Sequence, residues 1–367
     1  MPDVPLRKLN FEGSNMAAYA IWNNKGGVGK SYLTFQIATE YARQNQNKKV
    51  LVVDLCPQAN SSSMLLGGMI AGEQMLDAIH GTQPRRTISG YIEDRIASPY
   101  TSPSSGAGFL TNVQQYNRFA PSNLFLVVGD ERLEIQASRV ANATRPGPLD
   151  AWRTVHLWIA DLILDIQTLW DGEDNCVFID CNPSFSIYTE LALSAAERLI
   201  VPFSADGSSK RAVKAVLALV YGIRRQQGDP QSEFVIQTNQ YRMRAPQLYM
   251  YVGNRLTQMN NSSASAFKTV VDEIGVEIWN VWQTQPSLFC LHPNSTPTPT
   301  NRRLFKSMFQ YEVNDANTAS VVSGALGIPI STLTSGSKTV ANKSIFVNQS
   351  QLDKQVPNIQ ELVRNIE

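Results

Sequence analysis

Cysteine, histidine and net charge are all scarce in this sequence. Its 367 residues include four cysteines and three histidines, and neither a C-x-x-C pair nor a zinc-type spacing occurs. A disulfide framework and a structural zinc site are therefore not expected, and the thiols are predicted to be reduced. The 32 Lys and Arg residues offset 31 Asp and Glu residues to a formal charge of +1, so any basic surface must be local.

Long apolar runs are missing as well. No run approaches the roughly 20 residues that cross a bilayer, and residues 1–15 mix charges and prolines without the apolar core of a signal peptide. We therefore expect a cytoplasmic protein without a membrane-spanning segment. Hydrophobic residues make up 43% of the chain and charged residues 17%, which is typical of a globular protein and not of a disordered one.

The segment around the first glycine cluster has a recognisable order of elements. Residues 17–22 form a short apolar run typical of a buried strand, and residues 23–31 follow with the sequence N-N-K-G-G-V-G-K-S. A helical pattern then extends to about Arg43, and residues 49–55 have the pattern of a second buried strand. Strand, glycine loop, helix and strand make a βαβ unit, which predicts a parallel sheet covered by helices.

The same alternation continues along the chain. Further strands are predicted at residues 123–128, 176–180, 198–203 and 233–238, and helices at 149–170, 187–196 and 208–226. We expect an α/β fold, a doubly wound and mainly parallel sheet with helices on both faces. Two stretches, 84–121 and 260–300, interrupt the alternation and are predicted to be variable insertions. Residues 334–367 are predicted to form a C-terminal extension that ends in a helix.

The glycine loop has the residue types that bind a polyphosphate. Gly26, Gly27 and Gly29 let backbone N–H groups approach phosphate oxygens without side-chain clashes. Lys30 supplies a positive charge for the β- and γ-phosphates, and Ser31 supplies a hydroxyl for magnesium. A polyphosphate with Mg²⁺ is therefore the predicted ligand, and the family resemblance described next implies that it is ATP. Asn239 follows the strand predicted at 233–238 and is either a candidate for the adenine edge or an ordinary loop asparagine.

In its details the loop resembles the deviant phosphate loop of the ParA/MinD family of P-loop ATPases, and most closely that of the ParA/Soj partition proteins. Asn24 stands where the common motif has its first glycine, and Lys25 opens the K-G-G-V-G-K-S run. Residues 52–60, V-V-D-L-C-P-Q-A-N, resemble the D-x-D-P-Q strand end of that family, and residues 177–184, V-F-I-D-C-N-P-S, resemble its Walker B segment. The resemblance implies a ParA-like domain over residues 1–333.

The resemblance also implies roles for individual residues. Lys25 would reach across a homodimer that sandwiches ATP, to the phosphates of the partner subunit. Asp180 and Ser31 would hold magnesium, and Asp54 would support the same metal shell. The implied catalytic residues are Lys25, Lys30, Asp54 and Cys56. The implied nucleotide-binding residues are Lys25, Gly26, Gly27, Val28, Gly29, Lys30, Ser31, Tyr32 and Asn239.

Cys56 is the main departure from the family pattern. It stands where the second aspartate of D-x-D-P-Q lies, a carboxylate that sits near the attacking water in the resembled family. A neutral thiol orients water poorly, so ATP hydrolysis is expected to be slow unless another group substitutes. The alternative is that the change is tolerated in an active ATPase.

The partners implied by the resemblance are a second copy of the chain, non-specific DNA and a ParB-like or cargo adaptor protein. DNA binding needs clustered charge. The candidate clusters are Lys210, Arg211 and Lys214; Arg224 and Arg225; Arg242 and Arg244; and Arg302, Arg303 and Lys306. The implied role is partition or positioning of a plasmid, chromosome or other cargo, with nucleoid association if DNA is bound.

Two alternatives to a DNA-binding switch follow from the same residues. Each basic cluster alone could be an ordinary solvated face, which would leave an ATP-gated protein scaffold that never binds DNA. A MinD-like membrane helix is not expected, because residues 356–367 contain one basic residue, Arg364, and two glutamates. A metabolic ligase or amidotransferase is disfavoured because no substrate-site motif accompanies the loop.

Overall fold

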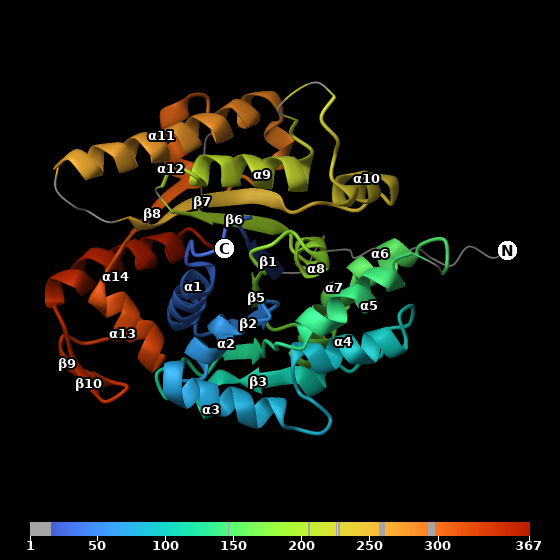
Figure 1. Cartoon of the computed structure of the whole chain (residues 1–367), viewed down its shortest axis with the longest axis horizontal. Coiled ribbons are helices and arrows are strands. Elements are labelled where there is room, and N and C mark those ends of the chain that lie inside the picture. Colours follow the sequence, from blue (N-terminus) through green and yellow to red (C-terminus); the bar gives the residue numbers. More distant parts are fainter. Residues whose placement is uncertain are drawn as a thin grey trace.

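The computed structural model describes residues 16–145, 147–204, 206–224, 226, 228–256, 261–292 and 298–367. Within these ranges eight strands form one sheet, in the order β3-β4-β2-β5-β1-β6-β7-β8 (Figure 1). Neighbouring strands are parallel except for β3 and β4, which are antiparallel. The predicted α/β fold with a mainly parallel sheet is confirmed.

The central strands are buried over nearly their whole length. They are β1 (Met16–Ile21), β2 (Lys49–Asp54), β4 (Leu124–Val127), β5 (Asn175–Asp180) and β6 (Arg198–Phe203). Their continuous Val, Ile, Leu and Ala runs fit a parallel sheet that is covered on both faces. The strands predicted at residues 17–22, 49–55, 123–128, 176–180 and 198–203 correspond to these five strands. Because the five are parallel, their carboxyl ends lie at the same edge of the sheet.

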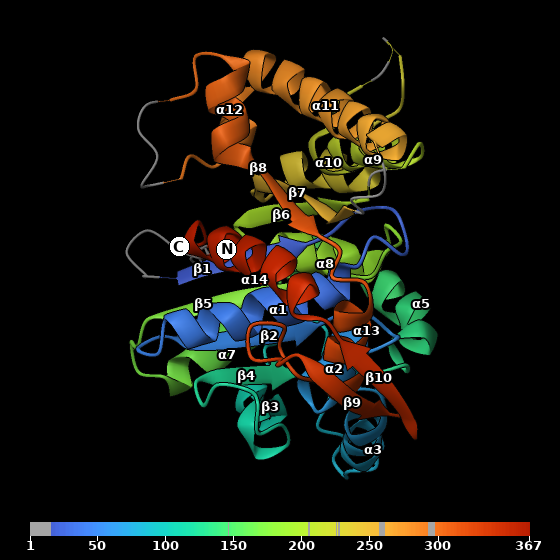
Figure 2. The same cartoon turned by 90° about the vertical axis from the view of Figure 1, so that its left-hand side faces the viewer.

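Successive residues of a strand pack into two different cores. Ala17, Tyr19 and Ile21 of β1 belong to a core shared with α1 (Lys30–Gln44), α13 (Thr318–Leu326) and α14 (Gln349–Arg364). Figure 2 shows these three helices together on one face of the sheet. Ala18 and Ala20 point into the other core.

Helices from the middle of the chain enclose that second core. They are α4 (Ile88–Ala97), α5 (Leu133–Ala143), α6 (Ala151–His156), α7 (Trp158–Leu169), α8 (Ile187–Ala195), α9 (Ser209–Tyr221), α11 (Asn261–Thr284) and α12 (Arg302–Phe309). The helices predicted at 149–170, 187–196 and 208–226 are confirmed as α6 with α7, α8 and α9. In Figure 1, α9, α11 and α12 lie above β6, β7 and β8.

Residues 84–121, predicted to be an insertion, contain several defined elements. They comprise α4, the 3-10 turns η1 (Gly106–Phe109) and η2 (Val113–Gln115), and the edge strand β3 (Leu110–Asn112). Tyr91 and Ile92 of α4 are fully buried, so this helix is anchored in the core. The second predicted insertion contains the whole of α11 and the turn η3 (Pro286–Leu288), while 257–260 and 293–297 lie outside the described residues.

The strand predicted at residues 233–238 is wrong, because these residues begin helix α10 (Glu233–Gln240). The Ser232 hydroxyl accepts a hydrogen bond from the backbone N–H of Val235 at 3.2 Å, which caps the helix. Phe234, Val235 and Thr238 are buried together on one side of it. A short apolar run such as residues 234–236 suits a strand or a helix equally, and here the capping serine favours the helix. The sheet continues instead in β7 (Gln247–Leu256) and β8 (Gln310–Asn314).

The C-terminal segment packs against α1, the helix that follows the glycine loop, and against α13. A hairpin of β9 (Gly336–Val340) and β10 (Lys343–Val347) precedes α14, and α14 contacts α1 and β8 (Figure 2). The Tyr32 hydroxyl of α1 donates a hydrogen bond to Oε1 of Gln355 in α14 at 2.8 Å. In the part of the chain that the structure describes, no helix has the length and apolar character that a bilayer crossing requires.

Candidate functional site

The glycine loop joins the end of β1 to the start of α1. Gly27 and Gly29 have φ angles of 76° and 78°, a left-handed conformation that favours glycine. This backbone lets the loop curl around the ammonium of Lys30, which donates to the carbonyl oxygens of Lys25 at 2.9 Å and Asn23 at 3.3 Å. Burial lowers the pKa of Lys30, although the nearby Asp180 counteracts it. The loop therefore holds one buried cation at its centre.

Two neighbouring strands fasten this loop. Asn254 of β7 is fully buried and donates from its side-chain amide to the carbonyl oxygens of Val28 at 2.9 Å and Gly29 at 3.3 Å. From inside the loop, the Asn23 amide donates to the carbonyl of Pro202 at 2.7 Å. Sequence reasoning did not identify Asn254, because it did not predict β7. Its only signal was a polar residue at the end of a short apolar run.

Lys25 lies beside the segment between β6 and α9. Its ammonium forms an ion pair with Asp206 and donates to the hydroxyls of Ser204 at 3.1 Å and Ser209 at 3.4 Å. Burial would raise the pKa of Asp206, but hydrogen bonds from Lys25 and Ser204 outweigh it and hold that pKa well below the ordinary value. Lys25 is thus bound within its own chain, and Asp206 is a further site residue that the sequence analysis missed.

Two carboxylates meet at the carboxyl ends of β2 and β5. Asp54 and Asp180 are direct partners in the parallel register, and both are fully buried. The Asp54 carboxylate accepts three hydrogen bonds, from the backbone N–H groups of Cys56 and Ser62, each at 3.0 Å, and from the Ser62 hydroxyl at 2.7 Å. Asp54 therefore anchors the turn into α2 (Asn60–Leu65).

Asp180 is bound very differently. Among the described residues, neither of its carboxylate oxygens has a hydrogen-bond partner. Burial raises its pKa, and the negative charge of Asp54 raises it further, whereas the Ser31 hydroxyl nearby lowers it. A buried carboxylate without a partner is costly unless a cation compensates it. A carboxylate beside a serine hydroxyl is an oxygen donor set that magnesium prefers, so these residues fit that ion.

Cys56 faces the same site with a protonated thiol. The residue is 3% exposed, and burial raises the pKa of its thiol to about 12, with the charges of Asp54 and Asp180 adding to the effect. The turn that follows has Ala59 at φ 49°, and Gly129 comes so close that an added Cβ would lie 2.8 Å from Cγ of Asp54. The turn is therefore tightly packed, with a thiol and not a carboxylate at position 56.

The structure does not bring two of the predicted residues to this site in the expected way. The Tyr32 side chain is buried and engaged with α14, so it serves packing between helices. Asn239 lies exposed on α10, and the strand on which its predicted adenine contact depended does not exist. The remaining predicted residues lie on the loop or at the ends of β2 and β5.

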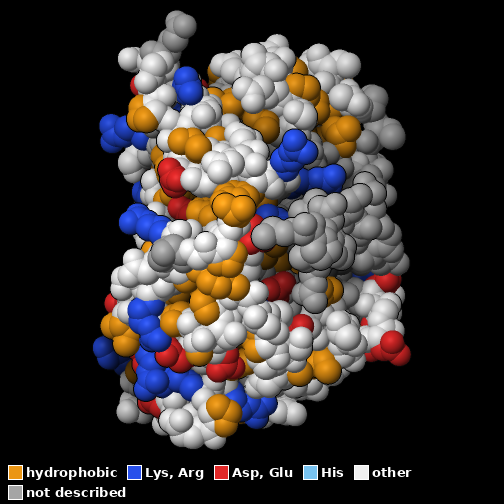
Figure 3. Space-filling model, turned by 90° about the vertical axis from the view of Figure 1, so that its right-hand side faces the viewer, with side chains coloured by type: hydrophobic (Ala, Val, Ile, Leu, Met, Phe, Trp, Pro, Cys, Tyr) orange, Lys and Arg blue, Asp and Glu red, His pale blue; other side chains and the backbone are white. Residues whose placement is uncertain are grey.

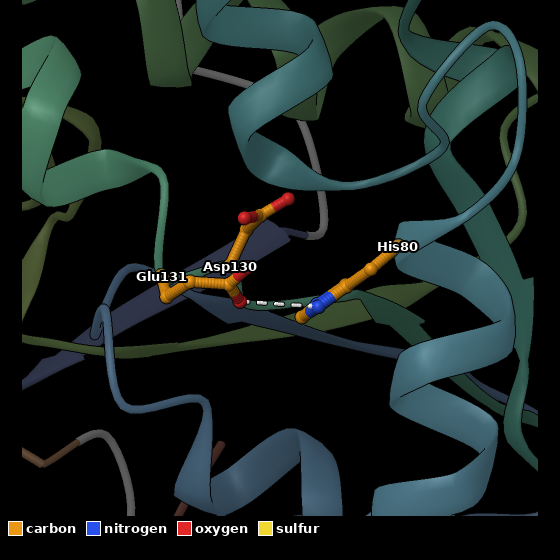
Figure 4. A group of neighbouring side chains, drawn as sticks. All are labelled: His80, Asp130 and Glu131. Atoms are coloured by element: carbon orange, nitrogen blue, oxygen red, sulfur yellow. Dashed lines mark ion pairs between the residues drawn. The ribbon is translucent and has the colours of Figure 1, made fainter.

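A second group of titratable residues lies at the end of β4. His80, at the end of α3 (Gly68–His80), forms an ion pair with Glu131 at 3.1 Å, beside Asp130 (Figure 4). These three residues could hold a metal ion by their chemistry. The Asp130 carboxylate, however, already accepts two hydrogen bonds from the guanidinium of Arg85, at 2.5 and 2.8 Å. The guanidinium of Arg85 supplies the positive charge that a metal ion would otherwise bring to Asp130. We therefore interpret these residues as a structural ion-pair cluster.

Two of the four predicted basic clusters, those on α9 and α12, form ion pairs with acidic residues of α11. Lys210 lies 3.1 Å from Glu273, and Lys214 lies 2.8 Å from Glu277. Asp272 likewise pairs with basic residues of α12, Arg302 at 2.7 Å and Lys306 at 2.5 Å. On the face shown in Figure 3, Lys and Arg side chains occur in several separate places and not as one continuous field. Arg225 lies outside the described residues.

Comparison with known proteins supports the interpretation of the loop. A family model described as an AAA domain matches residues 16–231, more than half of the chain. The ParA family protein pGP5-D of the Chlamydia psittaci virulence plasmid is 30% identical over 202 residues, 53% of this chain and 61% of that protein. An uncharacterized protein of Pseudomonas putida is 25% identical over 191 residues, 51% of this chain and 56% of that protein. The chain thus matches less than two thirds of the length of either relative.

Solved structures show the same fold. McdA of Cyanothece without nucleotide superposes with a TM-score of 0.55 at 14% identity, over 94% of this chain and 98% of McdA. A variant of McdA in complex with ATP gives a TM-score of 0.56 at 16% identity, over 97% and 98% of the two chains. With the family model matching the phosphate loop and both strand ends, the chain belongs to the AAA-domain family as a P-loop ATPase of the ParA/MinD type.

Proposed function

We propose that this protein is an ATP-dependent dimerising switch that partitions or positions a plasmid, a chromosome or another cargo. The observation that carries the proposal is the buried, unpartnered carboxylate of Asp180 beside Ser31 and the phosphate loop. Such a group needs a cation, and a magnesium-bound nucleotide on the loop would bring one. The similarity to a plasmid ParA family protein and to McdA, which has been solved with ATP, supports the same function.

Each residue of the site has a proposed part in holding MgATP. The backbone N–H groups of residues 26–29 and the ammonium of Lys30 would bind the phosphates. Ser31 and Asp180 would hold magnesium, and Asp54 would keep α2 against the site through its three hydrogen bonds. Bound magnesium supplies positive charge that neutralises the phosphate oxygens. Lys25 would leave Asp206 and pair with the nucleotide of a second copy, so that the γ-phosphate controls the homodimer.

Slow turnover is part of the proposal. Position 56 offers a buried, protonated thiol, which cannot orient an attacking water as a carboxylate would. The ATP-bound dimer would therefore be long-lived. Residues 1–333 would form the ATPase domain. Residues 334–367 would form an extension whose helix α14 packs on α1 and stabilises it. The adaptor would be a ParB-like or cargo protein.

DNA is the proposed second partner, but one observation favours a different candidate. Asp272, Glu273 and Glu277 neutralise most of the basic residues on α9 and α12. This pairing reduces the local charge on which sequence-independent DNA binding depends. An ATP-gated scaffold that recruits a protein without binding DNA is therefore the second candidate. If it binds DNA, the protein would associate with the nucleoid.

Light scattering with and without MgATP tests the proposed function. We expect wild type to be monomeric alone and dimeric with MgATP, and Lys25→Ala to bind nucleotide but remain monomeric. Lys338→Ala, on the hairpin before α14, is the control and should behave as wild type. A wild-type protein that binds MgATP without any change in mass would contradict a dimerising switch.

A further inference from the structure

Three consecutive serines begin helix α2, and they have three different environments. The Ser62 hydroxyl donates to Asp54 at 2.7 Å and accepts from the N–H of Gly129 at 2.9 Å. The Ser63 hydroxyl donates to the carbonyl of Gly68 at 3.4 Å. The Ser61 hydroxyl is fully buried and has no hydrogen-bond partner among the described residues. Of the three serines, Ser61 is thus the one whose buried hydroxyl is not accounted for by a hydrogen bond within the described residues.

Ser61 lies where the two buried carboxylates meet. Its hydroxyl is close enough to Asp54 and Asp180 to oppose part of the rise in pKa that burial gives each carboxyl, although it meets neither in hydrogen-bonding geometry. Within the described part of the chain, the Asp180 carboxylate is itself without a hydrogen-bond partner. Three unpartnered oxygens, one from Ser61 and two from Asp180, therefore occupy one buried region.

The backbone keeps Ser61 in this position. Asp54 holds the N–H of Ser62, the next residue, at 3.0 Å, and the N–H of Ser63 donates to the carbonyl of Ala59 at 2.9 Å. Gly129 closes the other side of the turn, where an added Cβ would come within 3.0 Å of Cα of Ala59. These contacts fix the backbone on both sides of the fully buried Ser61. A buried polar group held in this way is typical of a site that receives a ligand.

We propose that Ser61 is a positioning residue of the magnesium site, whose hydroxyl holds a water of the hydrated ion against Asp180. Magnesium keeps several of its waters when it binds to protein, and those waters need hydrogen-bond partners. With a thiol at position 56, Ser61 supplies a buried hydroxyl that, unlike that of Ser62, has no hydrogen-bond partner among the described residues. This inference rests on the proposed function, because it assumes that MgATP binds at the loop.

Magnesium titration of the nucleotide-bound protein tests the assignment. A fluorescent ATP analogue is held at low concentration with protein in excess, and Mg²⁺ is added while fluorescence and melting temperature are followed. Removal of an outer hydrogen-bond partner of a metal site typically weakens metal affinity at least tenfold. We expect Ser61→Ala to need about tenfold more Mg²⁺ for half of the response. Ser63→Ala is the matched control, on the same helix, and should respond as wild type.

Four outcomes distinguish the possibilities. A Mg²⁺ requirement raised only in Ser61→Ala, with an unchanged melting temperature in the absence of ligands, supports the assignment. An Mg²⁺ requirement equal to that of wild type overturns it. Equal losses in Ser61→Ala and Ser63→Ala, or a lower melting temperature of Ser61→Ala without ligands, would identify a packing role and also overturn it. Wild type that binds the analogue without any response to Mg²⁺ would instead refute the proposed function itself.

Discussion

The ammonium of Lys25 is paired with Asp206 of the same chain, at the start of α9. Ser204 and Ser209 hold the same ammonium at 3.1 and 3.4 Å. Lys25, which we propose reaches the partner subunit in the dimer, is therefore bound by residues of its own chain in the monomer. Dimerisation would have to exchange this pair for the phosphates of the second nucleotide.

Asp206→Asn should make dimerisation easier. The substitution removes the competing charge but keeps a polar side chain of the same size beside Ser208. Because the pair is partly exposed, its contribution is about 0.2–1 kcal/mol. We expect the MgATP concentration at half-dimerisation to fall by about two- to fivefold. Asp229→Asn is the control, since among the described residues its carboxylate accepts a hydrogen bond from the backbone N–H of Gln226 alone. A higher concentration requirement for Asp206→Asn would show that Asp206 acts within the dimer instead.

Asn254→Ala should weaken the phosphate loop. The two carbonyl oxygens that the Asn254 amide serves, those of Val28 and Gly29, would lose a buried donor. A lost buried hydrogen bond of this kind costs about 1–3 kcal/mol. We expect a lower melting temperature and at least a several-fold loss of ATP affinity by calorimetry. Asn47→Ala, in the exposed turn after α1, should change neither. An unchanged ATP affinity in Asn254→Ala would mean that the loop keeps its shape without Asn254.

The sequence predicted the sheet and the loop because both depend on local pattern. Short apolar runs that end in Asp54 and Asp180 are typical of parallel strands, and the K-G-G-V-G-K-S run lies between a strand and a helix. The prediction failed at residues 233–238, where a short apolar run fits strand and helix alike. There the hydroxyl of Ser232 caps a helix, and the run is too short for its hydrophobic pattern to distinguish the alternation of a strand from the spacing of a helix.

The contacts that complete the site could not be predicted in the same way. Asp206, Asn254 and Ser61 reach the loop or the carboxylates only through the packing of β6, β7 and α2. Nothing in their own sequence neighbourhoods marks them, because a polar residue after a strand is common. The ion pairs of Lys210 and Lys214 could not be predicted for the same reason, since their acidic partners come from a helix about 60 residues away.

Glu277→Gln tests whether α11 restrains DNA binding. Glu277 lies 2.8 Å from Lys214 and 3.5 Å from Lys210, so its neutralisation leaves the ammonium of Lys214 for phosphate contacts, while Lys210 keeps its ion pair with Glu273 at 3.1 Å. We expect about two- to fivefold tighter binding of a random DNA duplex at low salt, with a steeper loss as salt rises. Glu361→Gln on α14 is the control and should bind as wild type. If neither wild type nor any variant binds DNA in the presence of MgATP, the protein scaffold that does not bind DNA becomes the favoured function.

His292 should make stability depend on pH. Its Nε2 donates to the carbonyl of Tyr249 at 2.7 Å, its ring stacks on Tyr249 at 4.1 Å, and its Nδ1 has no partner in the described structure. Burial, with the charge of Arg198 nearby, lowers the pKa of His292. A lowered folded-state pKa means that its stabilisation is complete above the unfolded value of about 6.5 and is lost as pH falls below it.

The comparison with His292→Gln isolates that effect. At pH 7.5 the variant should melt below wild type because it loses the stacking on Tyr249. Towards pH 5.5 the gap should narrow by about 1–3 °C, since only wild type has an imidazole to protonate. A gap that is constant across this range would show that His292 keeps its ordinary pKa in the folded protein.

The most direct test of the account follows dimer mass and phosphate release together after MgATP is added to wild type and Cys56→Asp. The account predicts that wild type forms a dimer that persists while releasing little phosphate, and that the new carboxylate speeds release and shortens the life of the dimer. A wild type that turns over rapidly, with no gain in Cys56→Asp, would contradict the assigned role of Cys56. A wild type that stays monomeric in MgATP would contradict the switch itself.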